Sequence, residues 1–216
     1  MDRTITVRGT GRVVARPDQV EITLTLTAEH KEYEAAMGMA AGQLAKLQEA
    51  LAAEGFDKDA LKTTNFNVST RYDFHHDERG NTTRVFLGYD CTQGLRLTFP
   101  FDTARLGRVL SAVSGCTAEP ELNIRFTVAD PAALSDELLR SAAVGARQKA
   151  EVLAAASGAH LGELVRVYYT WEDRDFAAPT VMAAAGVRPR AKAAVMDFTP
   201  EDIDLTDQVT FTWELL

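Results

Sequence analysis

The sequence has no basic tract and no apolar run long enough to cross a membrane. Its 216 residues include 23 Lys and Arg against 31 Asp and Glu, so the formal net charge is −8. Nucleic acids and anionic lipids are held mainly by clustered Lys and Arg, and this balance argues against both as general partners. A membrane-spanning helix needs about 20 predominantly apolar residues in succession, and no stretch approaches that length. We expect no nucleic-acid partner and no transmembrane segment.

Cysteine is scarce as well, with Cys91 and Cys116 as the only two. Two cysteines are too few for a disulfide framework, and their spacing matches no metal-binding motif. We expect both to be buried thiols, and the sequence leaves open whether they pair.

A secretory signal is also missing from the sequence as given. Met1-Asp2-Arg3 leads directly into a predicted strand, without the apolar segment that such signals carry. This N-terminus predicts a cytoplasmic protein. If a signal peptide has been removed, the same N-terminus fits the periplasm or the cell envelope.

What the sequence does contain is typical of a globular protein, with 46% hydrophobic and 25% charged residues. These values argue against wholesale disorder and against a fibrous architecture. A chain of this length buries roughly 70% of its unfolded surface on folding, so its core does not need disulfide bonds to be stable.

Alternation of apolar and polar residues with period two predicts strands along much of the chain. The strands predicted in this way lie at residues 5–7, 20–26, 66–74, 85–99, 124–128, 165–171 and 209–215. Arg16-Pro17-Asp18 is a turn signal between the first two, which predicts that they pair as a hairpin. A polar connection with Gly80 predicts a second, long hairpin over residues 63–99.

Three segments carry helical periodicity. The first runs from His30 to Glu54, with Gly55 as its stop, and has the apolar stripe Tyr33, Met37, Ala40, Leu44, Leu47 and Leu51. The second begins at the N-cap Asp102 and stops by Gly115. The third opens with Asp130-Pro131 and ends at Gly158. Its stripe is rich in alanine, which predicts unusually close packing, and consists of Leu139, Ala143, Ala146, Ala150 and Leu153.

The predicted order is β-β-α-β-β-α-β-α-β-β, which indicates an α+β fold. We expect an antiparallel or mixed sheet with long hairpins and with helices packed on one face. We predict a single domain over residues 1–216. The segment at about 173–198 has no period, and we interpret it as a flexible insertion.

Gly9-Thr-Gly11 and Ala15 match the letters of a dinucleotide-binding motif. That mechanism requires a helix N-terminus directly after the glycines to hold a pyrophosphate. Here a turn and a period-two strand follow instead. We therefore interpret the glycines as sites of a bulge or of close backbone approach.

Candidate catalytic and metal-binding residues are few. The run His75-His76-Asp77-Glu78 has metal-ligand types, but neighbours on an extended chain point in opposite directions and cannot close a tetrahedral site alone. His30 and His160 lie at predicted helix edges, with Ser157 near His160, and neither has an acidic partner at a catalytic spacing. The sequence does not exclude a triad, because such residues meet in space. We predict a solvated hairpin tip, and no catalytic, cofactor-binding or metal-ligating residue.

The third helix carries Arg140, Arg147 and Lys149. Arg147 stands four residues before Glu151, which predicts a surface ion pair worth about 0.3 to 0.5 kcal/mol. An anion-binding or partner-binding face is the alternative interpretation.

Several blocks of residues together resemble the SIMPL-domain family of bacterial proteins. They are Ile5 to Asp18 with Gly9 and Gly11, the pair Gly88-Tyr89, Ala143 to Leu153 followed by Gly158 and Leu161-Gly162, and the ending from Phe198 to Ile203 and from Val209 to Leu215. The chain departs from the family pattern at Glu201, where a glycine is common.

The resemblance implies an α+β fold over essentially the whole chain. Many members are exported to the periplasm or cell envelope, some assemble into large rings or channel-like oligomers, and some are linked to stress tolerance and to a kinase-associated signalling protein. The family has no established catalytic residues to carry over.

We therefore predict a non-enzymatic structural or protein-interaction module without cofactors, which forms a homo-oligomer and has a protein partner still to be identified. The alternative is a small-molecule or metal-binding protein, or a cryptic enzyme. A deep pocket lined by Tyr72, Tyr89, Tyr169 or Trp171, with a buried charge, would favour the alternative.

Overall fold

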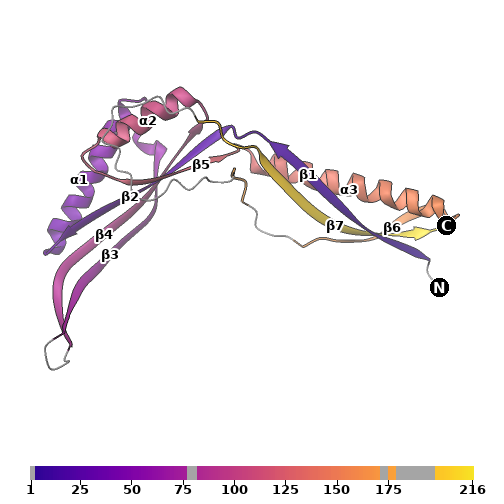
Figure 1. Cartoon of the computed structure of the whole chain (residues 1–216), viewed down its shortest axis with the longest axis horizontal. Coiled ribbons are helices and arrows are strands. Elements are labelled where there is room, and N and C mark those ends of the chain that lie inside the picture. The colour runs from indigo at the N-terminus through magenta and orange to yellow at the C-terminus, as the bar shows by residue number, and fades with distance from the viewer. Residues whose placement is uncertain (1–2, 77–81, 171–174, 179–197) are drawn as a thin grey trace. The chain divides into compact units, whose positions relative to one another are not determined.

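The computed structural model describes residues 3–76, 82–170, 175–178 and 198–216 (Figure 1). In the first half these residues form β1 (Thr4–Ala15), β2 (Gln19–His30), α1 (Tyr33–Ala52), the short 3-10 helix η1 (Lys58–Ala60), β3 (Leu61–His76) and β4 (Thr82–Pro100). In the second half they form α2 (Thr103–Gly115), β5 (Glu121–Thr127), α3 (Pro131–Ala156), β6 (Leu161–Tyr168) and β7 (Ile203–Leu215). The predicted α+β class and the predicted order of strands and helices are confirmed. None of the described helices is both long and apolar enough to span a bilayer.

The strands form two separate antiparallel sheets, with orders β1-β7-β6 and β3-β4-β2-β5. The chain predicted as one domain, residues 1–216, divides into two compact units that follow these sheets. The first unit holds β1, α3, β6 and β7. The second holds β2, α1, β3, β4, α2 and β5. Most of the predicted insertion at 173–198 lies outside the described residues.

The predicted hairpin between the first two strands is wrong. β1 pairs along its whole length with β7, and β2 pairs along its whole length with β4. The backbone N–H of Asp18 donates to the carbonyl of Thr127 at 3.1 Å, and its carboxylate accepts from the N–H of Ala129 at 2.7 Å. The turn signal at residues 16–18 therefore ends one strand and starts another without pairing them. By contrast, the long hairpin predicted over residues 63–99 is confirmed by the pairing of β3 with β4.

The core of the second unit lies between its sheet and the helices α1 and α2. The strands contribute Val20, Ile22, Leu24, Leu26, Leu95, Leu97 and Phe99, and the helices contribute Leu47, Leu51, Leu106, Val109 and Val113. The buried residues of β2 are the even-numbered ones, as period-two alternation requires. Asp102 caps α2 by accepting from the N–H of Arg105 at 2.6 Å, and Gly55 takes a positive φ of 83° just after α1.

The first residue of the predicted α1 stripe does not belong to the core. Tyr33 is 49% exposed, and its ring instead meets the ring of Tyr89 edge-on at a centroid distance of 5.5 Å. The buried stripe of the helix begins one turn later and consists of Ala36, Ala40, Leu47 and Leu51.

In the first unit, α3 packs on β1 and β7. Asp130 caps this helix by accepting from the N–H of Ala133 at 2.9 Å. The buried stripe is Leu138, Ala142, Ala146, Ala150 and Ala154, which advances in steps of four. Rows of this kind run obliquely to the helix axis, so a helix that uses one crosses its neighbour at an angle. The predicted stripe was correct at Ala146 and Ala150 but wrong at Leu153, which is 51% exposed.

The glycines of β1 allow α3 to come this close. A Cβ added to Gly9 would collide with the carbonyl oxygen of Ala142 and lie 2.7 Å from the Cβ of Ala146. A Cβ on Gly11 would collide with the carbonyl oxygen of Leu138. Both obstacles include helix backbone, which cannot rotate away. The interpretation of these glycines as sites of close backbone approach is confirmed.

The other face of this sheet is polar. Thr6 and Thr212 share a hydroxyl hydrogen bond of 3.0 Å, and the guanidinium of Arg12 donates to the carboxylate of Asp204 at 2.9 and 2.6 Å. The hydrogen bond from Arg12 lowers the pKa of Asp204, while the same pairing raises the pKa of Arg12. The first sheet thus has one face under α3 and one face in water.

Replacing Ala146 by Leu should overpack the contact between α3 and β1. We expect the free energy of unfolding to fall by about 1 to 3 kcal/mol, measured by equilibrium denaturation. Ala156→Leu, at the exposed end of the same helix, is the matched control and should change little. Equal stability of the two variants would contradict the close packing.

Replacing Gly11 by Ala should also destabilise the protein by about 1 to 3 kcal/mol, because the new methyl group meets helix backbone. Gly42→Ala is an informative control, since Gly42 lies within α1 and nothing lies within 4 Å of its added Cβ. That control should gain about 0.5 to 1 kcal/mol from helix propensity. Thermal melts followed by circular dichroism would show opposite shifts; a shift of the same sign in both would refute the argument.

Candidate functional site

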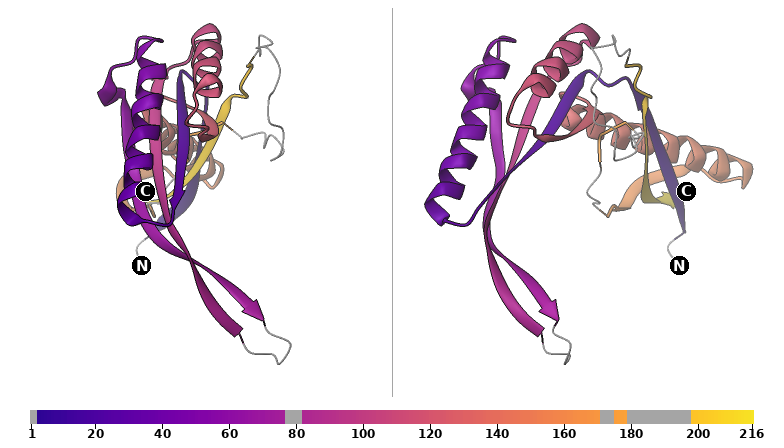
Figure 2. Two further views of the ribbon diagram at one scale, coloured as in Figure 1. Left: turned by 90° about the vertical axis from the view of Figure 1, so that its left-hand side faces the viewer. Right: turned by 60° about the vertical axis from the view of Figure 1, so that its left-hand side comes forward.

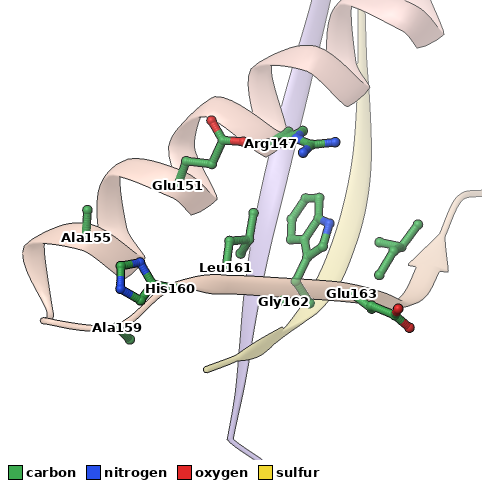
Figure 3. A pocket seen from close by; sticks show the side chains of 10 residues that line it. Arg147, Glu151, Ala155, Ala159, His160, Leu161, Gly162 and Glu163 are labelled. Atoms are coloured by element: carbon green, nitrogen blue, oxygen red, sulfur yellow. Dashed lines mark hydrogen bonds and ion pairs between the residues drawn. The ribbon is translucent and has the colours of Figure 1, made fainter.

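A groove of about 640 Å³ lies between α3 and β6 in the first unit (Figure 3). Its walls and floor are Arg147, Glu151, Ala155, Ala159, His160, Leu161, Gly162, Glu163, Leu164 and Trp213. Cavities that hold small molecules have volumes of about 300 to 1,000 Å³, so the size suits a small ligand.

The groove exists because three elements supply its sides. α3 presents Arg147, Glu151 and Ala155 at four-residue steps, which places them on one side of the helix. β6 forms the opposite wall, and its Leu164 stands opposite Trp213 in the register with β7. Trp213 is only 7% exposed and stacks on Phe211 at 5.4 Å with an interplanar angle of 17°. The floor at Trp213 is therefore apolar, and the rim is charged.

Arg147 and Glu151 form the ion pair predicted from their spacing. The Nε of Arg147 donates to Oε1 of Glu151 at 2.9 Å, and Figure 3 shows the two side chains turned toward each other. They are 72% and 51% exposed, so solvent weakens the pair. Lys149 points elsewhere, because its Nζ donates to the carbonyl oxygen of Arg8 at 3.5 Å. The cations of α3 are thus divided between different sides of the helix.

His160 and Ser157 do not form a catalytic pair. The hydroxyl of Ser157 donates to the carbonyl of Leu153 at 2.8 Å, where it helps to end α3. The backbone of His160 exchanges two hydrogen bonds of 2.9 Å with Leu216, and its side chain lies at the end of the groove. The structure therefore places His160 beside Arg147 and Glu151 in one hollow, and the described residues that line this hollow include no serine.

A second hollow, of about 520 Å³, lies in the second unit where β2 passes into α1. It is lined by Glu29, His30, Lys31, Glu32, Arg71, Leu87, Gly88 and Tyr89. Arg71 of β3 forms an ion pair with Glu29 of β2 and spans the intervening strand β4, where its register partner is Gly88. The Nδ1 of His30 accepts from the backbone N–H of Glu32 at 3.0 Å, so this histidine supports the entry to α1.

The predicted sign of a small-molecule site was a deep pocket with tyrosines and a buried charge. Tyr89 does line the second hollow, but the charged side chains of Arg71 and Glu29 are 40% and 53% exposed there. Trp171 lies outside the described residues, and Tyr169 packs against the core of the first unit. The second hollow therefore has a predicted tyrosine in its lining, but the charges of Arg71 and Glu29 are not buried.

Among the described residues, no group of three or more His, Cys, Asp or Glu side chains gathers around a point that could hold a metal. His75 and His76 end strand β3. Their side chains, and both Asp77 and Glu78, lie outside what the structure describes.

The two cysteines are buried and unbonded, as predicted for thiols of the core. Cys91 is 1% exposed, and its Sγ lies 3.7 Å from the Sδ of Met37. Burial raises the pKa of the Cys91 thiol, and the charge of Asp90 raises it further. The thiol therefore stays protonated at neutral pH and is a poor nucleophile.

The groove beside α3 was not predicted from the sequence. The spacing of Arg147 and Glu151 indicates one wall. The floor and the opposite wall depend on the pairing of β6 with β7, and no local pattern encodes that pairing.

Two curated proteins are similar to most of this chain. It is 26% identical over 165 residues to the "26 kDa periplasmic immunogenic protein" of Brucella melitensis, which covers 76% of this chain. The protein of the same name from Brucella abortus matches to the same extent. The chain spans 65% of the length of these curated relatives.

One solved structure, the regulatory subunit of aspartate kinase from Thermus flavus, aligns with 95% of this chain and 88% of its own at 10% identity. Its TM-score of 0.20 is too low to relate the two folds. The family described as "SIMPL: Protein of unknown function (DUF541)" matches residues 5–213, nearly the whole chain. That match shows that this chain belongs to the SIMPL family.

Proposed function

We propose that this chain is a non-enzymatic protein-interaction module that associates with copies of itself and works in the cell envelope. The observation that supports it is the concentration of exposed apolar side chains on the β3–β4 hairpin. Those side chains are Phe66 at 46%, Phe74 at 59%, Val85 at 39%, Phe86 at 45% and Leu87 at 39% exposure. Phe66, Phe74 and Phe86 lie on the face of the hairpin that carries Tyr72. Exposed apolar side chains gathered on one face of a folded protein are typical of an interaction site.

The shape of the hairpin explains why this surface is uncovered. β3 has 16 residues and β4 has 19, whereas strands of globular proteins usually have about five or six. Figure 2 shows the hairpin continuing past the beginning of α1, the helix that covers the same sheet. The outer part of the hairpin therefore carries apolar residues without a helix above them.

A place in the cell envelope is supported by the relatives, because the two Brucella proteins are named as periplasmic. A link to stress tolerance rests on the family resemblance alone and stays a prediction.

The groove between α3 and β6 favours a second candidate, a small-molecule-binding protein. Its apolar floor at Trp213 would take the flat part of a ligand, and Arg147 could exchange Glu151 for a ligand carboxylate or phosphate. A thermal-shift screen of metabolites and metals, repeated with Arg147→Ala, tests it. Stabilisation by an anionic ligand that depends on Arg147 would favour this candidate over the interaction module.

Self-association has a direct test in the solution mass of the intact chain. Size-exclusion chromatography with light scattering should give a discrete multiple of the 23.6 kDa chain mass over a tenfold range of concentration. A single-chain mass throughout would remove the support for a self-associating module.

The absence of enzymatic chemistry can be tested through the histidines. Replacing His30, His75, His76 and His160 together by Gln removes the residues best suited to metal binding and to acid–base chemistry near neutral pH. We expect that variant to keep its circular dichroism spectrum, its solution mass and its ability to complement a deletion strain. Loss of complementation in a folded variant of normal mass would favour the enzyme or metal-binding alternative.

A further inference from the structure

Strand β3 is an open edge of its sheet. Within the described part of the chain its only neighbour is β4. Natural edge strands are usually short or protected by proline, charged side chains or β-bulges, because unpaired N–H and C=O groups attract other strands. β3 has 16 residues without proline, and nearly all its side chains from residue 62 to residue 74 are exposed or half-buried. It is therefore well suited to pair with another strand.

An aromatic ladder reaches this edge on the face that α1 covers. Tyr33 of α1 contacts Tyr89 at a ring-centroid distance of 5.5 Å, and Tyr89 contacts Phe86 at 5.4 Å. Phe86 contacts its register partner Tyr72 at 5.6 Å, and the guanidinium of Arg84 lies 3.4 Å from the centre of the Tyr72 ring. The ladder ends at Tyr72, on the edge strand. Phe86 within the ladder is 45% exposed, so the ladder leaves apolar surface uncovered near this edge.

Tyr72 is flanked by two residues of opposite charge. Arg71 and Asp73 share the opposite face of the strand, where Arg71 also pairs with Glu29. The short run Arg71-Tyr72-Asp73 is therefore self-complementary. If a second copy of it lies antiparallel with the two tyrosines opposite each other, a cation stands opposite an anion on both sides of the tyrosines.

We infer that two copies of the chain pair antiparallel through β3, with Tyr72 opposite Tyr72 of the second copy. This inference rests on the proposed self-association and names its surface. A two-fold axis through this point makes every contact occur twice. Arg71 of each copy then faces Asp73 of the other on the polar face. Phe74 faces Thr70 on the other face, and the two aromatic ladders join across the axis.

The neighbouring registers are disfavoured by charge. If the axis moves by one residue to Arg71, two arginines stand directly opposite each other, and if it moves to Asp73, two aspartates do. Like charges directly opposite on paired strands are destabilising, whereas opposite charges stabilise the pair. Among these three registers, only the one centred on Tyr72 places unlike charges together and keeps the ladder continuous.

The test uses the intact chain and light scattering. Arg71→Asp and Asp73→Arg each place like charges opposite one another, and each should lower the solution mass at least two-fold. The double variant R71D/D73R restores unlike charges and should regain the native mass, although it still lacks the ion pair with Glu29. Arg96→Asp is the matched control, because Arg96 forms a similar ion pair with Glu21 on the central strands of the same sheet. Its mass should not change.

A cross-link gives a second, independent readout. Tyr72→Cys places a cysteine on the axis, and mild oxidation should yield a disulfide-linked dimer on a non-reducing gel. Cys91 and Cys116 are buried and do not interfere. If the native protein is an oligomer, but neither charge reversal lowers its mass and Tyr72→Cys does not cross-link, the β3 interface is refuted while self-association stands. If the native protein has the mass of one chain at every concentration, both the interface and the proposed function are refuted.

Discussion

The first unit depends on direct contact between the backbone of α3 and the backbone of β1. Gly9 and Gly11 provide the space on the strand, and Ala142 and Ala146 provide it on the helix. A helix usually stands off from a sheet because side chains of both elements separate their backbones. Here the separating side chains are absent at the centre of the contact. The alternating glycines of β1 and the alanine row of α3 therefore depend on each other. A larger side chain in either element would clash with the other element.

That constraint also shapes the groove. With α3 held tightly over β1, one helix cannot extend equally over β6, and the side of α3 that bears Arg147 and Glu151 faces an open stretch of sheet. Trp213 fills the floor of that stretch and stays mostly buried. The hollow thus results from the close contact of α3 with β1. Its floor is apolar because Trp213 lies on the covered face of β7, and its rim is charged because Arg147 and Glu151 lie on one side of α3.

The parts of this structure that could be predicted from the sequence are those with local causes. The caps Asp102 and Asp130 act within three residues, and the β3–β4 hairpin joins strands that are neighbours in the chain. Strand partners from distant parts of the chain could not be predicted. Thr4 pairs with Glu214, and nothing near either residue specifies the other. The same holds for the groove, whose walls and floor come from separate segments, and for the edge at Tyr72, whose exposure depends on the order of four strands.

The pairing of β1 with β7 has a consequence for the order in which the protein folds during synthesis on the ribosome. β1 leaves the exit tunnel before the other helices and strands of this chain, yet its strand partner β7 follows all of them. The second unit, whose strands and helices are consecutive from β2 to β5, has all of them available well before that. During synthesis, folding of the second unit can precede that of the first, while β1 remains an unpaired strand with an apolar face. Such a strand is prone to aggregate and is a natural client for a chaperone until β7 emerges.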